Sequence, residues 1–548
     1  MKKNWIVLAA ACATLLFGAD GEACTGLLVG KRASTDGSVM ISYAADSHAL
    51  YGELYHWPAA DWPKGAMLDI KEWDTGKPLG QIAQVEHTYS VVGNMNEHQV
   101  AITESTFGGR RELVDKNGIM DYGSLIYVAL QRSKSAREAI KVMTDLVSEY
   151  GYYSGGESFS IADKNEAWIM EMVGKGTGNK GAIWVAIRIP DDCISAHANQ
   201  SRIQQIPFDD KENCLYSPDV VSFAREKGYF KGKDADFSFA KAYCPYDFGA
   251  LRGCEARVWS FFRKYDKTMD RYEDFIKGDP SKEPMPLYIK PDRKLSVRDV
   301  QAAMRDHYEG TDLDMTRDAG AGPYKVPYRW RPMTFEVDGQ EYTNERAIAT
   351  QQTGFVIVPQ MRDWLPDAVG GILWFGVDDA DMALFNPIYC SSVAVPECYR
   401  VGNGDMLNFS WTSAFWIHNW VANMAYGKYN FMIKDIRKVQ QELEGGYAET
   451  IPAIDKAAAE LYAKDPAEAV RFLTWFSTTT ADSGTARWKK LGEYLLVKYI
   501  DGNVKKEENG TFKRNPYGLP AYPDFPGYDE EYYRSIVRTA GDRLRVTK

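Results

Sequence analysis

Residues 22–38 read Glu-Ala-Cys-Thr-Gly-Leu-Leu-Val-Gly-Lys-Arg-Ala-Ser-Thr-Asp-Gly-Ser, and the fold is organised around this stretch. An apolar run at residues 24–30 is followed by Ser34-Thr35-Asp36-Gly37 and by a second apolar run at residues 39–43. Two apolar runs joined by such turn residues predict a β-hairpin. We therefore expect the first strand of the fold to start at, or directly after, Cys24.

The segment before Cys24 has the pattern of an export signal. Lys2 and Lys3 are basic, residues 5–17 are apolar, and residues 21–23 supply the small side chains that a signal peptidase requires. Cleavage after residue 23 would make Cys24 the first residue of an exported protein, periplasmic or secreted. The apolar stretch is short for a bilayer, and no later segment is long and uncharged enough to span one. The alternative of a lipid anchor on Cys12 lacks the large aliphatic residue needed three positions earlier.

Composition narrows the class of protein. The 548 residues are 45% hydrophobic and 26% charged, which is ordinary for a folded chain with a substantial core. The net charge of -10 gives no basic footprint, so we expect no nucleic-acid partner.

The cysteine count leaves one thiol over. Of eight cysteines, Cys12 would leave with the signal, and the other seven fall into three sequence-close pairs plus one. An exported protein can form disulfides, so we expect bridges, although spacing alone does not fix their connectivity. The pairs closest in sequence are Cys193 with Cys214, Cys244 with Cys254, and Cys390 with Cys398, and the remaining thiol is Cys24.

Periodicity along the chain predicts an α+β fold. Hairpins come first, a helical pair follows, and hairpins resume, whereas alternating strand–helix units are not seen. Ser135 and Glu138 form a capping-box pattern at the start of the second helix. The predicted strands are residues 88–92, 100–103, 158–162, 167–172, 183–189, 194–198, 347–358 and 368–377, with 183–189 and 194–198 continuing one sheet. The predicted helices are residues 122–132, 135–150, 432–444, 451–464, 466–477 and 488–499, and residues 508–528 are expected to be irregular.

A cysteine at a mature N-terminus carries its own base. A free α-amine has a pKa of roughly 7.7–8.0, so near neutral pH it can accept the thiol proton. The thiolate is the nucleophile, and amine plus thiol form an activated pair within one residue. Such chemistry needs no metal and no organic cofactor, and the histidines show no zinc-binding spacing. The alternative for Cys24 is a buried, unreactive thiol.

An ordered set of motifs gives a more specific indication. The chain resembles the cysteine dipeptidases of the N-terminal-nucleophile hydrolase superfamily, which are relatives of penicillin V acylase and bile salt hydrolase. That resemblance implies a four-layer αββα sandwich with a helical C-terminal extension. The matching segments are Cys24-Thr25-Gly26, Val29-Gly30-Lys31, Asp36-Gly37-Ser38, Asp46, Asn96-Glu97, Glu104-Ser105-Thr106, Glu166-Ala167-Trp168, Asn199-Gln200-Ser201-Arg202, Ala256-Arg257, Trp374-Phe375-Gly376 and Asn386-Pro387.

The resemblance also implies roles for particular residues. Cys24 matches the nucleophile, and Asp46 matches the acid that orients its amine. Asn199 matches the amide that donates to the oxyanion, a role that usually contributes most to acyl transfer. Arg257 matches the arginine that favours the thiolate. Without the resemblance, each of the last three would be read as an ordinary turn, capping or ion-pair residue.

Two positions depart from the acylase pattern. Acylases have an arginine three residues before the aspartate, where this chain has Tyr43, so that positive charge is missing or comes from elsewhere. A second oxyanion asparagine of the acylases falls near Thr106. Glu104 is a candidate for binding a substrate ammonium, although a solvated carboxylate at a strand end is the ordinary alternative.

These observations favour dipeptide hydrolysis through a thioester on Cys24. One alternative keeps the chemistry but acts on penicillin or bile-acid amides, and another is an exported binding protein with an unreactive Cys24. The expected organisation is a signal at residues 1–23, a catalytic domain at 24–430, and a helical region at 431–548 packed on it. Small peptides are the expected partners.

Overall fold

The computed structural model describes residues 24–546, so the expected signal at residues 1–23 lies outside the described residues. Two antiparallel sheets form its centre. In spatial order, the first sheet contains β17 (Tyr288–Ile289), β15 (Ile194–His197), β1 (Gly26–Val29), β2 (Val39–Ile41), β20 (Thr353–Met361), β21 (Ile372–Val377) and β22 (Asn386–Tyr389), with β3 (Tyr43–Asp46) also paired to β20. The second sheet contains β16 (Cys214–Tyr216), β14 (Ala182–Ile189), β13 (Ala167–Gly174), β12 (Gly156–Ala162), β11 (Ala101–Gly108), β10 (Met95–Asn96), β9 (Val91–Val92) and β4 (His56–Trp57).

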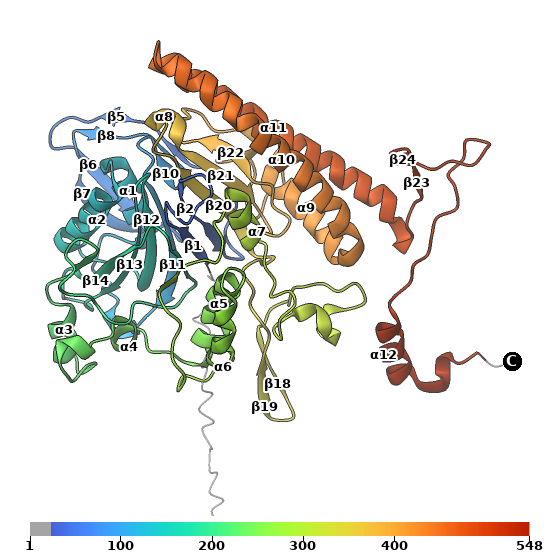
Figure 1. Ribbon diagram of the computed structural model, residues 1–548, viewed down its shortest axis with the longest axis horizontal. Coiled ribbons are helices and arrows are strands. Elements are labelled where there is room, and N and C mark those ends of the chain that lie inside the picture. Colours follow the sequence, from blue (N-terminus) through green and yellow to red (C-terminus); the bar gives the residue numbers. More distant parts are fainter. Residues whose placement is uncertain (1–23, 547–548) are drawn as a thin grey trace, which may run out of the picture.

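Helices cover the outer faces of both sheets, which gives four layers (Figure 1). On one side, α1 (Tyr122–Arg132) and α2 (Ala136–Tyr150) pack on the second sheet through one apolar cluster. On the other side, α5 (Ala256–Arg263), α7 (Val297–Ala303) and two later helices pack on the first sheet. A further cluster fills the space between the sheets. The α+β fold and its layered arrangement agree with the sequence prediction.

The composition of β1 follows from this double burial. Leu28 points between the two sheets, whereas Leu27 and Val29 face the helices. Because both faces of the strand are covered, an uninterrupted apolar run replaces the alternation of a half-exposed strand. β2 repeats the pattern, with Val39 and Ile41 between the sheets and Met40 under the helices.

The predicted helical pair is confirmed. α1 spans the predicted residues, and the Asp121 carboxylate accepts from the backbone N–H of Ser124 at its start. α2 begins after Ser135, whose hydroxyl accepts from the backbone N–H of Glu138. These caps satisfy donors that have no partner inside the first helical turn.

One strand was assigned to the wrong sheet. Residues 194–198 were expected to continue the sheet of residues 183–189, but β15 pairs with β1 in the first sheet, Gly26 opposite His197. The connection between β14 and β15 instead crosses from one sheet to the other. Cys193 is its last residue, and the Cys193 carbonyl accepts from the backbone N–H of Gly30 at 3.0 Å. A period-two pattern identifies a strand but not its neighbour.

The four C-terminal helical segments are two long helices. α10 (Tyr429–Tyr462) continues through Pro452, and α11 (Pro466–Tyr499) begins after Asp465, whose carboxylate accepts from two backbone N–H groups. The apparent break at residues 445–450 is bridged because both helices bury one face against the molecule, α11 mainly against β22. The boundary expected near residue 430 stays a prediction.

The remaining elements are short. They are β5 (Ala60–Asp61), β6 (Met67–Lys71), β7 (Pro78–Ala83), β8 (His87–Thr88), α3 (Val220–Glu226), α4 (Phe239–Tyr243), α6 (Glu273–Ile276), β18 (Thr334–Val337), β19 (Gln340–Thr343), α8 (Asp367–Gly370), α9 (Ala414–Tyr426), β23 (Glu507–Glu508), β24 (Thr511–Phe512) and α12 (Glu530–Ala540). The last three belong to an arm that extends away from the sheets (Figure 1). Within residues 24–546, no helix combines the length and apolar character needed to cross a membrane.

The expected disulfides are not formed. All seven cysteines in the described part of the chain are free thiols. Cys193 lies just before β15 of the first sheet, whereas Cys214 lies in β16 of the second. The Cys390 thiol donates to the Asp367 carbonyl at 3.3 Å. Closeness in sequence therefore did not identify disulfide partners in this fold.

A buried histidine in the helical layer makes stability depend on pH. His418 on α9 stacks on Trp488 of α11, with ring centroids 4.6 Å apart, and its Nδ1–H donates to the Met382 carbonyl at 3.4 Å. Burial lowers the pKa of His418 to about 3. Between the ordinary pKa near 6.5 and pH 3, only the unfolded chain binds this proton, so acid favours unfolding over that range.

We therefore expect His418→Phe to reduce the acid sensitivity of folding. Lowering the pH from 8 to 5 costs the wild type about 2 kcal/mol through this histidine. The variant keeps the aromatic contact but does not titrate. Urea unfolding of both proteins at the two pH values measures the difference, and an equal loss in both would contradict the assignment.

Candidate active site

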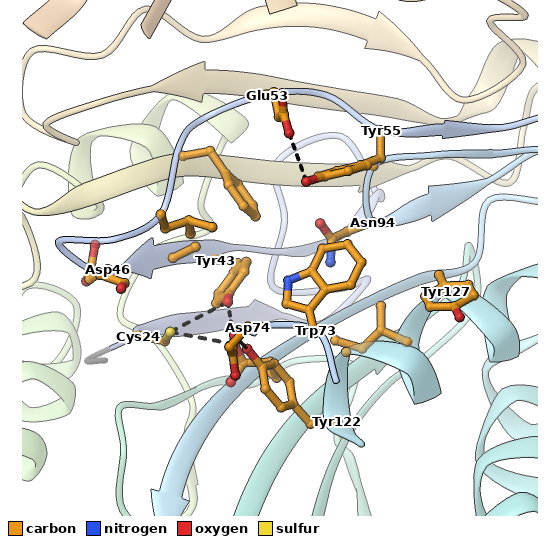
Figure 2. Close-up of a pocket in the computed structure, with 18 of the residues that line it drawn as sticks. Cys24, Tyr43, Asp46, Glu53, Tyr55, Trp73, Asp74, Asn94, Tyr122 and Tyr127 are labelled. Carbon is orange, nitrogen blue, oxygen red and sulfur yellow. Dashed lines mark hydrogen bonds between the residues drawn. The ribbon is translucent and has the colours of Figure 1, made fainter. Parts of the chain in front are cut away.

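Cys24 lies at the base of a pocket between the two sheets (Figure 2). Its side chain is 5% exposed, and its thiol lies 3.5 Å from the Tyr43 hydroxyl and 3.6 Å from Oε1 of Glu104. The Tyr43 hydroxyl in turn donates to the same Glu104 oxygen. β3 supplies Tyr43 and β11 supplies Glu104, so the thiol sits where strands of both sheets meet.

These surroundings disfavour the thiolate. Burial is the main cause that raises the pKa of the Cys24 thiol well above its usual value, and the carboxylates of Glu104 and Asp46 raise it further. The Tyr43 hydroxyl and the backbone of Asp46 oppose this by hydrogen bonding. A proton acceptor or a positive charge beside the sulfur is therefore needed to make the nucleophile.

The carboxyl group of Glu104 has a pKa near neutral pH. Burial raises its pKa to about 7, while the hydrogen bond from Tyr43 acts in the opposite direction. A side-chain hydrogen bond with Glu157 also lowers the pKa, so two buried acidic side chains lie side by side here. Because buried carboxylates gain from a charged N–H donor, Glu104 is a candidate to hold a positively charged group of a ligand.

Arg257 links Cys24 to Asn199 through hydrogen bonds. Its Nη1 donates to the Cys24 carbonyl at 2.6 Å and to the Thr25 hydroxyl at 2.8 Å. Its Nη2 donates to the Ala198 carbonyl at 3.0 Å and to Oδ1 of Asn199 at 2.9 Å. Arg257 is 1% exposed, so this planar fork holds Cys24 and Asn199 in one rigid unit.

Asn199 has a constrained geometry. Its φ is 61°, in the left-handed region, and its backbone N–H donates to the Ser105 hydroxyl at 3.2 Å. Its side-chain Nδ2 donates to the Thr106 carbonyl at 2.6 Å. With Oδ1 held by Arg257, one of the two Nδ2 hydrogens is committed and the other can serve a developing oxyanion.

A neutral histidine supports this arrangement. His197 has its Nδ1 2.6 Å from the Ser105 hydroxyl and its Nε2 2.7 Å from the Ser160 hydroxyl. Burial lowers its pKa to about 3. Its ring lies against Gly26, where a Cβ would be only 2.7 Å away, so the residue two after Cys24 must lack a side chain.

Asp46 is paired with a distant arginine. Its carboxylate forms a buried ion pair with Arg346 and accepts from the Thr353 hydroxyl at 2.6 Å. Asp46 also lines the pocket. Burial raises its pKa, and Arg346 is the main influence that lowers it again. Arg346 thus brings a positive charge beside Asp46. The acylases have an arginine three residues before this aspartate, a position that Tyr43 occupies in this chain.

Thr106 is not directed at the pocket. Its hydroxyl donates to Oε1 of Glu157 at 2.7 Å, and its carbonyl receives Asn199. Thr106 is not among the residues that line the pocket, whereas Cys24, Asp46 and Glu104 are. Of the six site residues expected from the sequence, these three reach the pocket. Arg257 joins Cys24 to Asn199 without lining the pocket, and the Thr106 carbonyl holds the Asn199 amide.

The pocket is rich in aromatic and acidic groups. About 780 Å³ of empty space lies within its outline, and this figure includes space that is open to solvent. Sequence reasoning missed several of its residues. Tyr43 was visible as a departure from the acylase pattern, whereas the aromatic wall comes from segments with no recognisable signature. Arg346, which pairs with Asp46 but does not line this pocket, follows no motif either. The residues of that wall are Tyr55, Trp57, Trp73, Tyr122, Tyr127, Phe355 and Phe375.

Comparisons with known proteins fit this site. A probable dipeptidase of Latilactobacillus sakei is 29% identical over 472 residues, covering 83% of this chain and 90% of that protein. A probable dipeptidase of Salmonella dublin is 28% identical over 67% of this chain and 81% of its own length. Dipeptidase A of Lactobacillus helveticus is 24% identical over 74% of this chain and 82% of its own length.

The family model for peptidase family C69 matches residues 23–56 and 50–442. That match begins one residue before Cys24 and takes in Glu104, Asn199, Arg257 and Arg346. With most of the chain and every element of the site included, this protein belongs to peptidase family C69, and it is a peptidase.

Proposed function

We propose that this peptidase is a dipeptidase of the N-terminal-nucleophile type, with Cys24 as the first residue of the mature chain. The observation that carries the proposal is the position of the Cys24 thiol at the base of a pocket, within 3.6 Å of the Glu104 carboxylate. The names of the relatives support dipeptides as the substrate class.

The first half of the reaction forms a thioester. The α-amine of Cys24 takes the thiol proton, and the sulfur attacks the carbonyl carbon of the peptide bond. The carbonyl electron pair moves to oxygen, where the second Nδ2–H of Asn199 and backbone N–H groups receive it. When the tetrahedral species collapses, the C–N bond breaks and the protonated amine of Cys24 gives its proton to the leaving amine.

The second half releases the acyl group. Water enters after the leaving amine departs, and the α-amine of Cys24 takes one of its protons as the oxygen attacks the thioester. The C–S bond then breaks, the product leaves as a carboxylic acid, and the sulfur is reprotonated. Arg257 acts through positioning, because its hydrogen bonds to the Cys24 carbonyl and to Asn199 fix the distance between nucleophile and oxyanion donor.

Exposure of Cys24 is part of the proposal. Residues 1–23 act as a signal that a signal peptidase removes after Ala23, in the periplasm or on secretion. The newly formed amine then supplies the base and the positive charge that the buried thiol needs. Expression in a compartment without a signal peptidase should leave residues 1–23 attached, and their removal there would indicate self-processing instead.

Glu104 binds the ammonium group of the substrate in this scheme. Its carboxyl group lines the pocket beside the sulfur, and a charged N–H donor gives a carboxylate a strong hydrogen bond. The α-ammonium of a dipeptide lies two bonds from the carbonyl that is attacked, so a carboxylate beside the sulfur is well placed to receive it. The carboxyl group must be ionised to do this, and its pKa of about 7 makes binding depend on pH.

The pH profile of kcat/KM tests that role. Below pH 6, two ionisations limit the wild type, the pair at Cys24 and the carboxyl of Glu104, so log kcat/KM should rise with a slope of about two. Glu104→Gln removes one of them, and the slope should fall to about one. An unchanged slope in the variant would contradict an ionised Glu104 in the binding step.

A substrate panel tests the proposal as a whole. The purified mature protein is assayed with dipeptides, with penicillin V and with conjugated bile acids. Hydrolysis of dipeptides alone, or at far higher kcat/KM, is the expected result. Preferential cleavage of penicillin V or a bile-acid amide would replace the dipeptidase with an acylase that uses the same nucleophile.

A further inference from the structure

Four aromatic rings form one wall of the pocket, and we call Tyr55, Trp57, Trp73 and Tyr127 the ring cluster. The rings of Tyr55 and Trp57 are stacked with centroids 5.6 Å apart, and those of Trp57 and Tyr127 are stacked at 5.2 Å. Trp73 lies across them, 5.2 Å from Tyr55 and 6.3 Å from Tyr127. Tyr55, Trp73 and Tyr127 lie on the side of the pocket away from Cys24 (Figure 2).

The hairpin that carries Trp73 is fixed in place. β6 and β7 form the hairpin, and the backbone N–H of Trp73 near its turn donates to the Asp121 carboxylate at 2.8 Å. Its indole packs directly on Gly123 of α1, where a Cβ would lie 2.5 Å from the Trp73 side chain. Because these two contacts attach the hairpin to the start of α1, Trp73 has a fixed position in the wall of the pocket.

Two carboxylates stand at the edge of the ring cluster. Glu53 accepts from the Tyr55 hydroxyl at 2.9 Å, and Asp74, beside Trp73, accepts from the Tyr122 hydroxyl at 2.7 Å. Asp74 is close enough to Glu104 for its charge to raise the pKa of that group. The described side chains that line the pocket include these three carboxylates and Asp46 but no lysine, arginine or histidine. Only Asp46 among them has an ion-pair partner in the described chain.

A cation on an apolar stem fits such a wall. The methylene stem of lysine or arginine packs on ring faces, and its charge is attracted both by those faces and by carboxylates nearby.

We propose that the ring cluster, with Asp74 and Glu53, is a subsite for the side chain of an N-terminal lysine or arginine of the substrate. This inference rests on the proposed dipeptidase function. With the α-ammonium at Glu104, the adjoining side chain leaves the same Cα and extends across the pocket toward Asp74 and the ring cluster. The preferred substrates are therefore dipeptides with a basic N-terminal residue.

Matched substrates isolate the charge. Lysyl-alanine and norleucyl-alanine share the same four-carbon stem, but only the former carries an ammonium group, and phenylalanyl-alanine measures a purely aromatic occupant. We expect kcat/KM for lysyl-alanine to exceed that for norleucyl-alanine by roughly tenfold in the wild type. The variant Asp74→Asn should reduce this ratio by roughly fivefold, and the ratio cancels any effect that the two substrates share.

A matched control lies on the same hairpin. Asp69 is exposed on β6, bonds to Gln81 at 2.8 Å and does not line the pocket, so Asp69→Asn removes the same charge and should leave the ratio unchanged. Glu53→Gln removes the other carboxylate at the edge of the ring cluster, and it should lower the ratio as Asp74→Asn does.

Three outcomes would overturn the subsite. These are equal rates for the lysyl and norleucyl substrates, a preference for phenylalanyl-alanine over both, or an equal effect of Asp74→Asn on all three. If the wild type hydrolyses none of the three dipeptides, the proposed function itself fails and the subsite with it.

Discussion

Replacing Cys24 with alanine is expected to lower kcat for dipeptide hydrolysis by at least about 10⁴-fold, because no other thiol lines the described pocket. The substitution removes one buried sulfur atom and leaves the backbone of β1 in place. The Arg257 contact to residue 24 goes to its carbonyl, so it survives the change. Folding should therefore be nearly unaffected, with a cost of about 1 kcal/mol.

Cys193→Ala is the matched control for this result. Cys193 is also a buried free thiol, but it lies outside the pocket, before β15. That variant should keep full activity. Circular dichroism and urea unfolding establish that both variants are folded before their rates are compared. Full activity in folded Cys24→Ala would show that the nucleophile has been assigned wrongly.

The second large effect is expected at Arg346, where the Arg346→Met substitution removes one partner of a buried ion pair. Side chains of Arg346 and Asp46 are 6% and 0% exposed, so the remaining carboxylate would be buried without its countercharge. Breaking such a pair from one side typically costs about 3–5 kcal/mol. Activity should fall as well, because Asp46 lies beside Cys24 and influences its pKa.

A double variant separates stability from catalysis. Adding Asp46→Asn to Arg346→Met removes the stranded charge and should recover most of the lost stability. Activity should stay low if Asp46 orients the amine of Cys24. As a surface comparison, Arg400→Met breaks the exposed pair with Glu397 and should cost less than about 1 kcal/mol. Recovery of both stability and rate in the double variant would reduce Asp46 to a structural role.

Local signals in the sequence were sufficient for much of the scaffold. The apolar run after Cys24 predicted β1, and the caps at Asp121 and Ser135 define helices that the structure places at the predicted residues. These elements are set by neighbouring residues in the chain, so periodicity and capping identify them. The motif set also singled out Cys24 and Glu104, which the fold brings within 3.6 Å.

Those local signals could not predict contacts between residues that are far apart in the sequence. Arg346 lies 300 positions from Asp46, in a loop without a motif, and only the fold brings the two together. The partner of β15 and the fate of the cysteines depend in the same way on which strands become neighbours. Gly445, Gly446 and Pro452 indicate a helix break locally, but burial of the α10 face keeps the helix continuous. Tertiary contacts override local propensity in each of these cases.

Intact-mass spectrometry of the active enzyme tests whether catalysis depends on Cys24 as a free N-terminal residue. We expect one chain that begins at unmodified Cys24, with activity tracking the amount of that species. A fully active chain that still carries residues 1–23, or one that begins downstream of Cys24, would contradict it.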